Sequence, residues 1–226
     1  MDVVEVRDIS NERERAWRRH PLPKEMMRKI CMFLEGIDGS VLDIGCGYGN
    51  YTKQLEREHR YVVGVDVRNS FDRSKISSSL DFCLADGFRF PFRDGSFQAA
   101  VSLDVIEHVA DDLAFLLEIR RVMKKDASLV LETPNRERLS NRMRNALGRK
   151  VRYPYDLGVD PILGRCIHLR EYSRRDLIHL LVKAGFEPAE VEALWLGLQK
   201  FRLGFSRFPK LLNSYAQCWL VRAIRR

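Results

Sequence analysis

Short apolar runs, each bounded by polar or glycine positions, recur along the chain and predict buried β-strands. Five of these runs lie in the first part of the chain, at 40–45, 61–67, 81–86, 97–104 and 127–135. Two more, at 189–197 and 214–224, predict strands towards its end.

Between the strands, apolar residues at helical spacing predict amphipathic helices over 12–35, 51–58, 111–124 and 173–186. Pro21 and Pro23 predict a break in the first helix, because proline removes a backbone donor. Asp111 and Ser173 are the predicted N-caps of the last two helices, and Gly185 predicts the end of the final one.

Strands that alternate with helices predict an α/β fold, with a seven-stranded, mainly parallel sheet covered by helices on both faces. The segment 136–172 interrupts this alternation and is too long for an ordinary connection in a compact domain. It follows the fifth strand, whose carboxyl end lies where open α/β sheets bind ligands. We therefore expect it to be an insertion that covers a substrate.

Composition narrows the class of protein. The 226 residues are 45% apolar and 31% charged, which is typical of a globular domain with one core. No apolar stretch is long enough to span a membrane, and the charged start of the chain lacks the apolar centre of a signal peptide. The five cysteines are scattered without a C-x-x-C pair, so we expect no disulfide framework or structural zinc, and a cytoplasmic location.

Charge is distributed unevenly. Residues 136–226 carry 19 Lys and Arg against 8 Asp and Glu, a net of +11, whereas the whole chain has a net charge of +8. Residues 1–135 therefore carry a net of −3. Such an asymmetry predicts either an anionic partner, such as RNA or a lipid headgroup, or simply a solvated basic face.

A glycine-rich turn, Gly45-Cys-Gly47-Tyr-Gly49, joins the first strand to the next helix. Glycines here allow a ligand to approach the backbone closely, and the amides at the start of the helix face that ligand. The dinucleotide fingerprint requires glycine at position 50, which is Asn50, and a phosphate-binding P-loop requires a Gly-Lys-Ser/Thr ending that is absent. Asp66, at the end of the second strand, can accept the hydroxyls of an adenosine ribose.

Together with "VLDIGCGYG" and "VVGVDV", the segment "LADGFRFPFRDGSFQAAVSLDVIEHV" (84–109) resembles the class I S-adenosylmethionine-dependent methyltransferases. The resemblance is to the small-molecule branch that includes the ubiquinone and menaquinone methyltransferases, and it extends through 168–186. It implies a Rossmann-like sheet with a cofactor-binding core at 38–135. A helical cap at 1–37, the insertion at 136–172 and a C-terminal helix with strands at 173–226 would complete a single domain.

The resemblance also implies roles for individual residues toward S-adenosylmethionine. The methionine moiety would lie beside the first strand and its turn, the ribose on Asp66, and the adenine between Val67 and the loop that holds Asp86 and Gly87. Leu103 and Asp104 would line the channel near the sulfonium. The complete predicted cofactor set is Asp43, Gly45, Gly47, Tyr48, Gly49, Asp66, Val67, Asp86, Gly87, Leu103 and Asp104.

Methyl transfer from a sulfonium mainly requires alignment, and a base is needed only for a neutral hydroxyl or an acidic carbon. His108 and His168 are the main candidate bases, with a hydrogen-bonding role as the alternative for the first and a helix-anchoring role for the second. Tyr153, Tyr155 and Tyr172, in or beside the insertion, are further candidates. Some quinone-pathway relatives bind a divalent metal with a carboxylate-x-x-Glu-His sequence, which Asp104, Glu107 and His108 match loosely. The Glu-His pair is also found in relatives without metal, and we predict none here.

The function predicted from the sequence is methyl transfer to a small or lipid-like acceptor, most readily at oxygen. One alternative is an RNA methyltransferase that uses the basic C-terminal half. Another is a non-catalytic module that binds S-adenosylmethionine.

Overall fold

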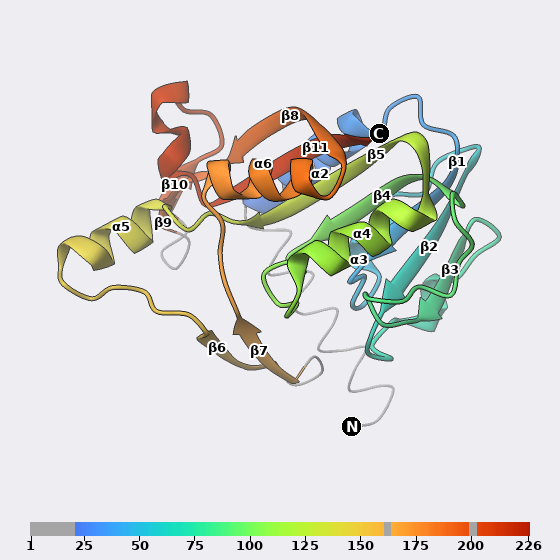
Figure 1. Ribbon diagram of the computed structural model, residues 1–226, viewed down its shortest axis with the longest axis horizontal. Helices are drawn as coiled ribbons and strands as arrows, with labels where there is room; N and C mark the ends of the chain where they lie inside the picture. The colour runs from blue at the N-terminus through green and yellow to red at the C-terminus, as the bar shows by residue number, and fades with distance from the viewer. Residues whose placement is uncertain (1–20, 161–163, 199–202) are drawn as a thin grey trace.

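A computed structural model describes residues 21–160, 164–198 and 203–226. Its centre is a seven-stranded sheet with the order β3-β2-β1-β4-β5-β11-β8. The first five strands of this order run parallel, and β11 is antiparallel to both β5 and β8 (Figure 1). The sheet strands are β1 (Gly39–Ile44), β2 (Arg60–Asp66), β3 (Leu80–Leu84), β4 (Phe97–Leu103), β5 (Met123–Pro134), β8 (Phe186–Leu194) and β11 (Cys218–Arg225). The predicted mainly parallel seven-stranded α/β sheet is confirmed.

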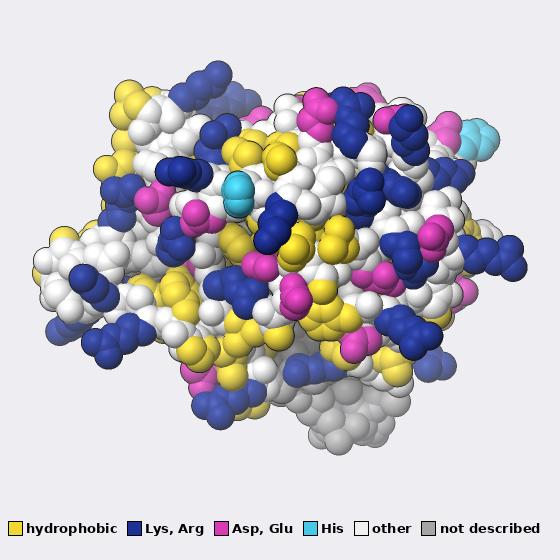
Figure 2. Space-filling model, in the orientation of Figure 1, with side chains coloured by type: hydrophobic (Ala, Val, Ile, Leu, Met, Phe, Trp, Pro, Cys, Tyr) yellow, Lys and Arg dark blue, Asp and Glu magenta, His cyan; other side chains and the backbone are white. Residues whose placement is uncertain are grey.

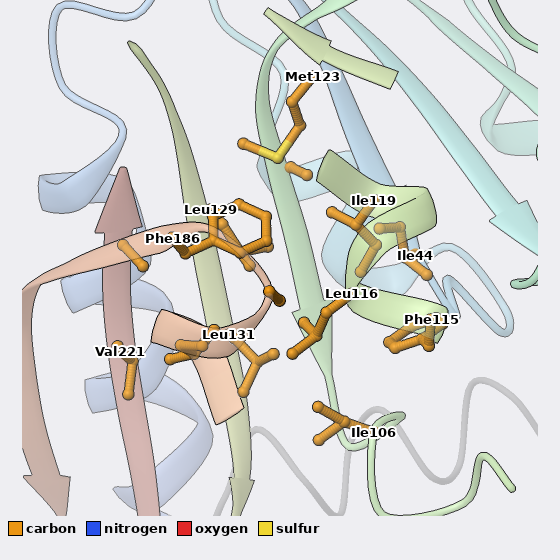
Figure 3. Packing of buried hydrophobic residues seen from close by; sticks show 14 of the residues in the cluster. Ile44, Ile106, Phe115, Leu116, Ile119, Met123, Leu129, Leu131, Phe186 and Val221 are labelled. Atoms are coloured by element: carbon orange, nitrogen blue, oxygen red, sulfur yellow. The ribbon is translucent and has the colours of Figure 1, made fainter. Parts of the chain in front are cut away.

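Helices cover both faces of this sheet. On one face, α4 (Asp112–Val122) and α6 (Arg174–Lys183) pack on residues of β1, β4, β5 and β11. Figure 3 shows this cluster, in which Leu116 of α4 lies beside Leu131 of β5 and Ile119 of α4 lies beside Ile44 of β1. On the other face, α2 (Pro21–Phe33) buries Met26 and Ile30 in a second cluster. All of these contacts remove apolar surface from water, which is the main stabilising term of the fold.

The helix boundaries follow local chemistry. The Asp111 side chain accepts a hydrogen bond from the amide of Ala114, and Ser173 accepts one from Asp176, so both predicted N-caps are confirmed. Gly185 has φ +82° after the end of α6, as a glycine C-cap requires.

Two predicted helices have different bounds in the structure. The first helix is described from Pro21, so its prolines lie in the first turn, where an amide donor is not required; the rest of the predicted span, 12–20, and the cap residues 1–20 lie outside the described residues. The helix predicted at 51–58 is shorter, because α3 covers only Asn50–Gln54. The chain turns there to reach β2.

The predicted insertion contains elements of its own. After β5 the chain forms α5 (Leu139–Ala146) and then an antiparallel hairpin of β6 (Tyr155–Asp160) and β7 (Gly164–His168). A second hairpin, β9 (Leu196–Leu198) with β10 (Leu203–Phe205), and a 3-10 helix, η3 (Lys210–Tyr215), precede β11. A short 3-10 turn, η1 (Arg73–Lys75), lies between β2 and β3. None of the described helices has the length and apolar composition needed to cross a bilayer.

Candidate active site

The carboxyl ends of β1 to β5 meet at one edge of the sheet. The strand order reverses direction between β1 and β4, since β1 is followed in sequence by strands on one side and β4 by strands on the other. In open α/β sheets such a switch point opens a crevice that binds ligands. A hollow of about 670 Å³ lined by Gly39, Arg60 and Tyr61 lies at the amino ends of β1 and β2 instead, and it contains none of the predicted site residues.

The glycine turn follows β1, and its three glycines all have left-handed backbones. Their φ angles are +74° at Gly45, +51° at Gly47 and +77° at Gly49. A Cβ at Gly45 would lie 2.3 Å from Cγ2 of Val105, and one at Gly49 would lie 2.3 Å from the ring of Phe71. At Gly47 a Cβ would meet nothing within 4 Å. The outer glycines therefore allow close packing, whereas Gly47 presents bare backbone to open space.

Asp66 ends β2 beside this turn. Its carboxylate accepts a hydrogen bond of 2.9 Å from the amide of Gly47 and another of 2.9 Å from the amide of Arg68. A carboxylate can accept about four hydrogen bonds, so lone pairs are left for ribose hydroxyls. The glycine turn and Asp66, two parts of the predicted cofactor site, are thus hydrogen-bonded to each other.

Asp43 lies within β1, beneath the turn. It is buried, and the hydroxyl of Thr52 donates to its Oδ2 at 2.6 Å. Burial, with a smaller contribution from the nearby Asp66, raises the pKa of Asp43 to about 6 against the lowering effect of the Thr52 hydrogen bond. The hydrogen bond from Thr52 connects α3 to β1 through Asp43.

The side of the crevice next to β2 and β3 is apolar. Val67 is 66% exposed directly after β2, and Leu84, which pairs in register with Asp66, is 57% exposed at the end of β3. Asp86 follows Leu84 and accepts from the amide of Phe88 at 3.0 Å. Two exposed aliphatic side chains beside an acidic acceptor suit a flat heterocycle with an amino group. Leu84 was not predicted from the sequence, because it reads as an ordinary strand residue.

The remaining predicted cofactor residues lie around the same edge. The Tyr48 carbonyl accepts from Lys75, which connects the glycine turn to η1. Gly87 packs against Phe115, since a Cβ there would lie 3.0 Å from its ring. Leu103 is half-buried at the end of β4, and the exposed Asp104 follows it with φ +52°.

His108 is connected to the insertion by backbone hydrogen bonds. Its Nδ1 lies 2.8 Å from the carbonyl oxygen of Ile167 in β7, and the amide of Leu169 donates to the carbonyl of Glu107 at 2.8 Å. A carbonyl oxygen can only accept, so Nδ1 carries the hydrogen and Nε2 of the neutral ring has a free lone pair. Burial lowers the pKa of His108, which favours this neutral form.

His168, at the end of β7, is held by a carboxylate. Its Nδ1 lies 3.0 Å from Oε1 of Glu171, whose other oxygen accepts from Arg138, Asn141 and Tyr153. Despite burial, which by itself would raise it, these hydrogen bonds and the charge of Arg138 lower the pKa of Glu171 to about 2. The ionised carboxylate accepts the hydrogen of Nδ1, so Nε2 is the ring nitrogen turned away from Glu171.

The two histidines meet over a buried acid. Their ring centroids are 4.8 Å apart at an interplanar angle of 74°, and Nε2 of His168 lies 3.9 Å from Oε1 of Glu107. Thr133 donates to the other oxygen of Glu107, whereas Oε1 has no hydrogen-bond partner among the described residues. Burial raises the pKa of Glu107 well above its usual value, with Asp104 and Glu132 adding to the effect.

Glu107, His108 and His168 offer three ligand atoms within 4.8 Å of one another. Neighbouring ligands of a tetrahedral zinc are only roughly 3.4 Å apart, given bonds of about 2.1 Å, so these side chains would have to move closer to bind one. That no metal is bound stays a prediction.

The site contains residues that sequence reasoning missed. Glu171 and Arg138 hold His168, yet they come from different parts of the insertion; Tyr153, a candidate base in the sequence, donates to the same Glu171 carboxylate. Glu132 is buried in β5 with its Oε2 unpartnered among the described residues, and burial raises its pKa. No local pattern marks these residues, because their role depends on contacts between distant segments.

Comparison with known proteins agrees with this geometry. A family model described as a methyltransferase domain matches residues 42–131, which is the segment from β1 to β5. Residues 42–131 are therefore similar to a methyltransferase domain. A probable S-adenosylmethionine-dependent methyltransferase of Mycobacterium tuberculosis is 28% identical over 193 residues, which cover 81% of this chain and 60% of that protein. This chain therefore spans less than two thirds of the length of that relative.

Two further similarities support the same family. A demethylmenaquinone methyltransferase of Staphylococcus haemolyticus is 24% identical, with 88% of this chain and 86% of that one covered. The crystal structure of an S-adenosylmethionine-dependent methyltransferase from Methanosarcina mazei has a TM-score of 0.66 at 19% identity, covering 87% of this chain and 96% of its own. The latter likeness shows that this methyltransferase shares the fold.

S-adenosylmethionine, the cofactor of this family, fits the residues present. The bare backbone at Gly47 leaves room beside the turn, Asp66 keeps free lone pairs, and Val67 with Leu84 offers apolar surface for adenine. A sulfonium would supply an already activated methyl group at this site. The predicted binding role of each residue stays a prediction.

Proposed function

We propose that this methyltransferase moves a methyl group to an oxygen of a small or lipid-like acceptor by in-line displacement. In this reaction a lone pair of the acceptor oxygen forms the new bond to carbon, the bond between carbon and sulfur breaks, and the hydroxyl proton leaves. His168 takes that proton on Nε2, and His108 lies beside it.

The observation that best supports this proposal is the hydrogen bond between Nδ1 of His168 and Glu171. A base must present an unprotonated nitrogen in a fixed direction, and a carboxylate on the opposite nitrogen provides both conditions. Glu107, whose pKa burial raises well above its usual value, lies 3.9 Å from the same Nε2. Glu107 lies on the loop after β4, close in sequence to the predicted channel residues Leu103 and Asp104, so His168 beside Glu107 would lie near the methyl group.

The insertion has a second role in this proposal. Arg138 and Tyr153 belong to segments on either side of α5, and both hydrogen-bond to Glu171. The insertion would therefore cover the acceptor while it fixes the base. Excluding water in this way favours transfer to the acceptor rather than to solvent.

The test is release of S-adenosylhomocysteine from a panel of phenols, carboxylic acids and amines. We expect turnover of a hydroxyl or phenol, and His168→Gln should lower kcat by about 10²–10⁴-fold without changing cofactor affinity. His108→Gln is the matched control and should cost less, since its ring is held only by a backbone carbonyl. Turnover of amines alone, or equal rates for wild type and His168→Gln, would contradict the proposal.

The positive charge of residues 136–226 keeps RNA as a second candidate acceptor. Affinity for RNA should then fall steeply as the salt concentration rises, because Lys and Arg side chains that bind phosphates displace the counterions of the RNA. A salt series of gel shifts with bulk tRNA tests it. Turnover of any acceptor would rule out the non-catalytic alternative. The cytoplasmic location is a separate prediction.

A further inference from the structure

One end of the molecule combines exposed apolar side chains with cations. This basic end consists of residues 139–152, which include α5, together with β9, β10 and η3. In Figure 1 these elements lie together at the left, where α5 contacts β9 and β9 contacts η3. Figure 2 shows dark-blue and yellow side chains at the same end.

The apolar side chains at this end are large and well exposed. Leu147 is 72% exposed, Phe205 is 70% exposed and Leu211 is 79% exposed, and Met143 and Leu203 are exposed beside them. Single exposed leucines are ordinary, but a group of them on neighbouring elements marks an interaction surface. They come from α5, β10 and η3, so the group is formed only in the fold.

The charges at this end are of one sign. Residues 139–152 contain five Lys and Arg and no Asp or Glu. Among the described residues, Arg144, Arg149, Lys150 and Arg152 form no ion pair. A hollow of about 360 Å³ beside α5 is lined by Arg136, Arg142 and Lys150, and its acidic residue, Glu137, already lies 3.7 Å from Arg142. This hollow could receive an anionic group of the size of a phosphate.

We propose that the basic end docks on an anionic lipid surface, with its apolar side chains entering the interface and the cations contacting headgroups. This inference goes beyond methyl transfer. Aliphatic side chains ringed by Lys and Arg are the composition of interfacial binding segments. RNA fits less well, because Arg142 covers the ring of Tyr215 at 4.6 Å and Arg144 lies 5.7 Å from that of Tyr155, so these rings are not free to stack on bases.

Flotation of the whole chain with phosphatidylcholine vesicles, with and without phosphatidylglycerol, tests the proposal. Binding should require phosphatidylglycerol and weaken with salt. Each cation near an anionic bilayer contributes roughly fivefold to binding, so Arg149→Gln/Lys150→Gln should weaken it by about 25-fold. Leu147→Ser/Leu211→Ser should weaken it at least as strongly, because both side chains enter the interface.

Two double variants away from the basic end are matched controls. Lys124→Gln/Lys125→Gln removes the same charge from the start of β5, and Leu117→Ser/Val182→Ser removes exposed apolar side chains from α4 and α6. Both should bind vesicles as the wild type does. All variants should bind S-adenosylhomocysteine equally, which separates loss of docking from loss of the fold or of the cofactor site.

Two results would overturn the proposal. One is no binding to phosphatidylglycerol vesicles at low salt. The other is vesicle binding that is unchanged in Leu147→Ser/Leu211→Ser. If Arg149→Gln/Lys150→Gln also lowers the affinity for tRNA, the surface binds anions by charge alone.

Discussion

The two sides of the cleft in this methyltransferase are built by different means. On the proposed cofactor side, the glycine turn and Asp66 lie at the ends of adjacent parallel strands and are joined by a hydrogen bond from the Gly47 amide. On the proposed acceptor side, His168 is held by Glu171, Arg138 and Tyr153 through a side-chain network that spans the insertion. The first site depends on local backbone geometry, whereas the second depends on long-range packing.

The largest expected effect is on the cofactor side. Asp66→Ala removes an acceptor for two ribose hydroxyls, each such charge-assisted hydrogen bond being worth about 1.5–3 kcal/mol. Affinity for S-adenosylhomocysteine should fall by about 4 kcal/mol, roughly a thousandfold in Kd, as measured by titration calorimetry. Asp86→Ala, which removes a single exposed acceptor, should cost much less. Equal losses would show that Asp66 has no special place in the site.

Alanine substitutions at Gly45 and Gly47 should distinguish an effect on folding stability from an effect on cofactor binding. Gly45→Ala combines a left-handed φ with an overlap on Val105 and should lower the free energy of unfolding by about 3 kcal/mol. Gly47→Ala should cost only about 1–2 kcal/mol, because open space surrounds it, yet it should weaken cofactor binding. Chemical denaturation measures the first effect and calorimetry the second. If Gly47→Ala binds the cofactor normally, the turn is only structural.

Asp43 on one side and Glu171 on the other should change the stability of the fold with pH in opposite directions. The pKa of Asp43 is raised to about 6, so its contribution to stability falls as pH rises from about 4 to 6. The pKa of Glu171 is lowered to about 2, so its contribution is complete above pH 4.5 and is lost as pH falls toward 2. Each amounts to up to about 3 kcal/mol.

Denaturation of wild type, Asp43→Asn and Glu171→Gln across pH 2–8 checks these signs. Asp43→Asn should remove the decline between about pH 4 and 6, and Glu171→Gln should remove part of the loss at acid pH. Parallel curves of stability against pH for all three proteins would show that neither carboxyl has a different pKa in the folded and unfolded states.

The smallest expected effects are at the helix caps on the two sides. Asp111→Ala and Ser173→Ala each remove one side-chain acceptor, from α4 and α6, and each should lower the free energy of unfolding by about 1 kcal/mol. Asp111→Asn and Ser173→Thr keep the acceptor and should cost less. Losses well beyond this size would mean that the caps also position the neighbouring loops.

The sequence by itself determined the sheet, its helices and the cofactor side. The spacing of apolar residues predicts the strands and helices. The glycines and Asp66 follow or end predicted strands, and the carboxyl ends of parallel strands are where such sheets bind ligands. Only the tertiary structure brought His108 and His168 together, 60 positions apart, and showed that Glu171 holds one of them. It also gathered Leu147, Phe205 and Leu211 at one end. A local pattern reports which face of an element is apolar, but contacts between side chains of distant segments depend on how the insertion packs.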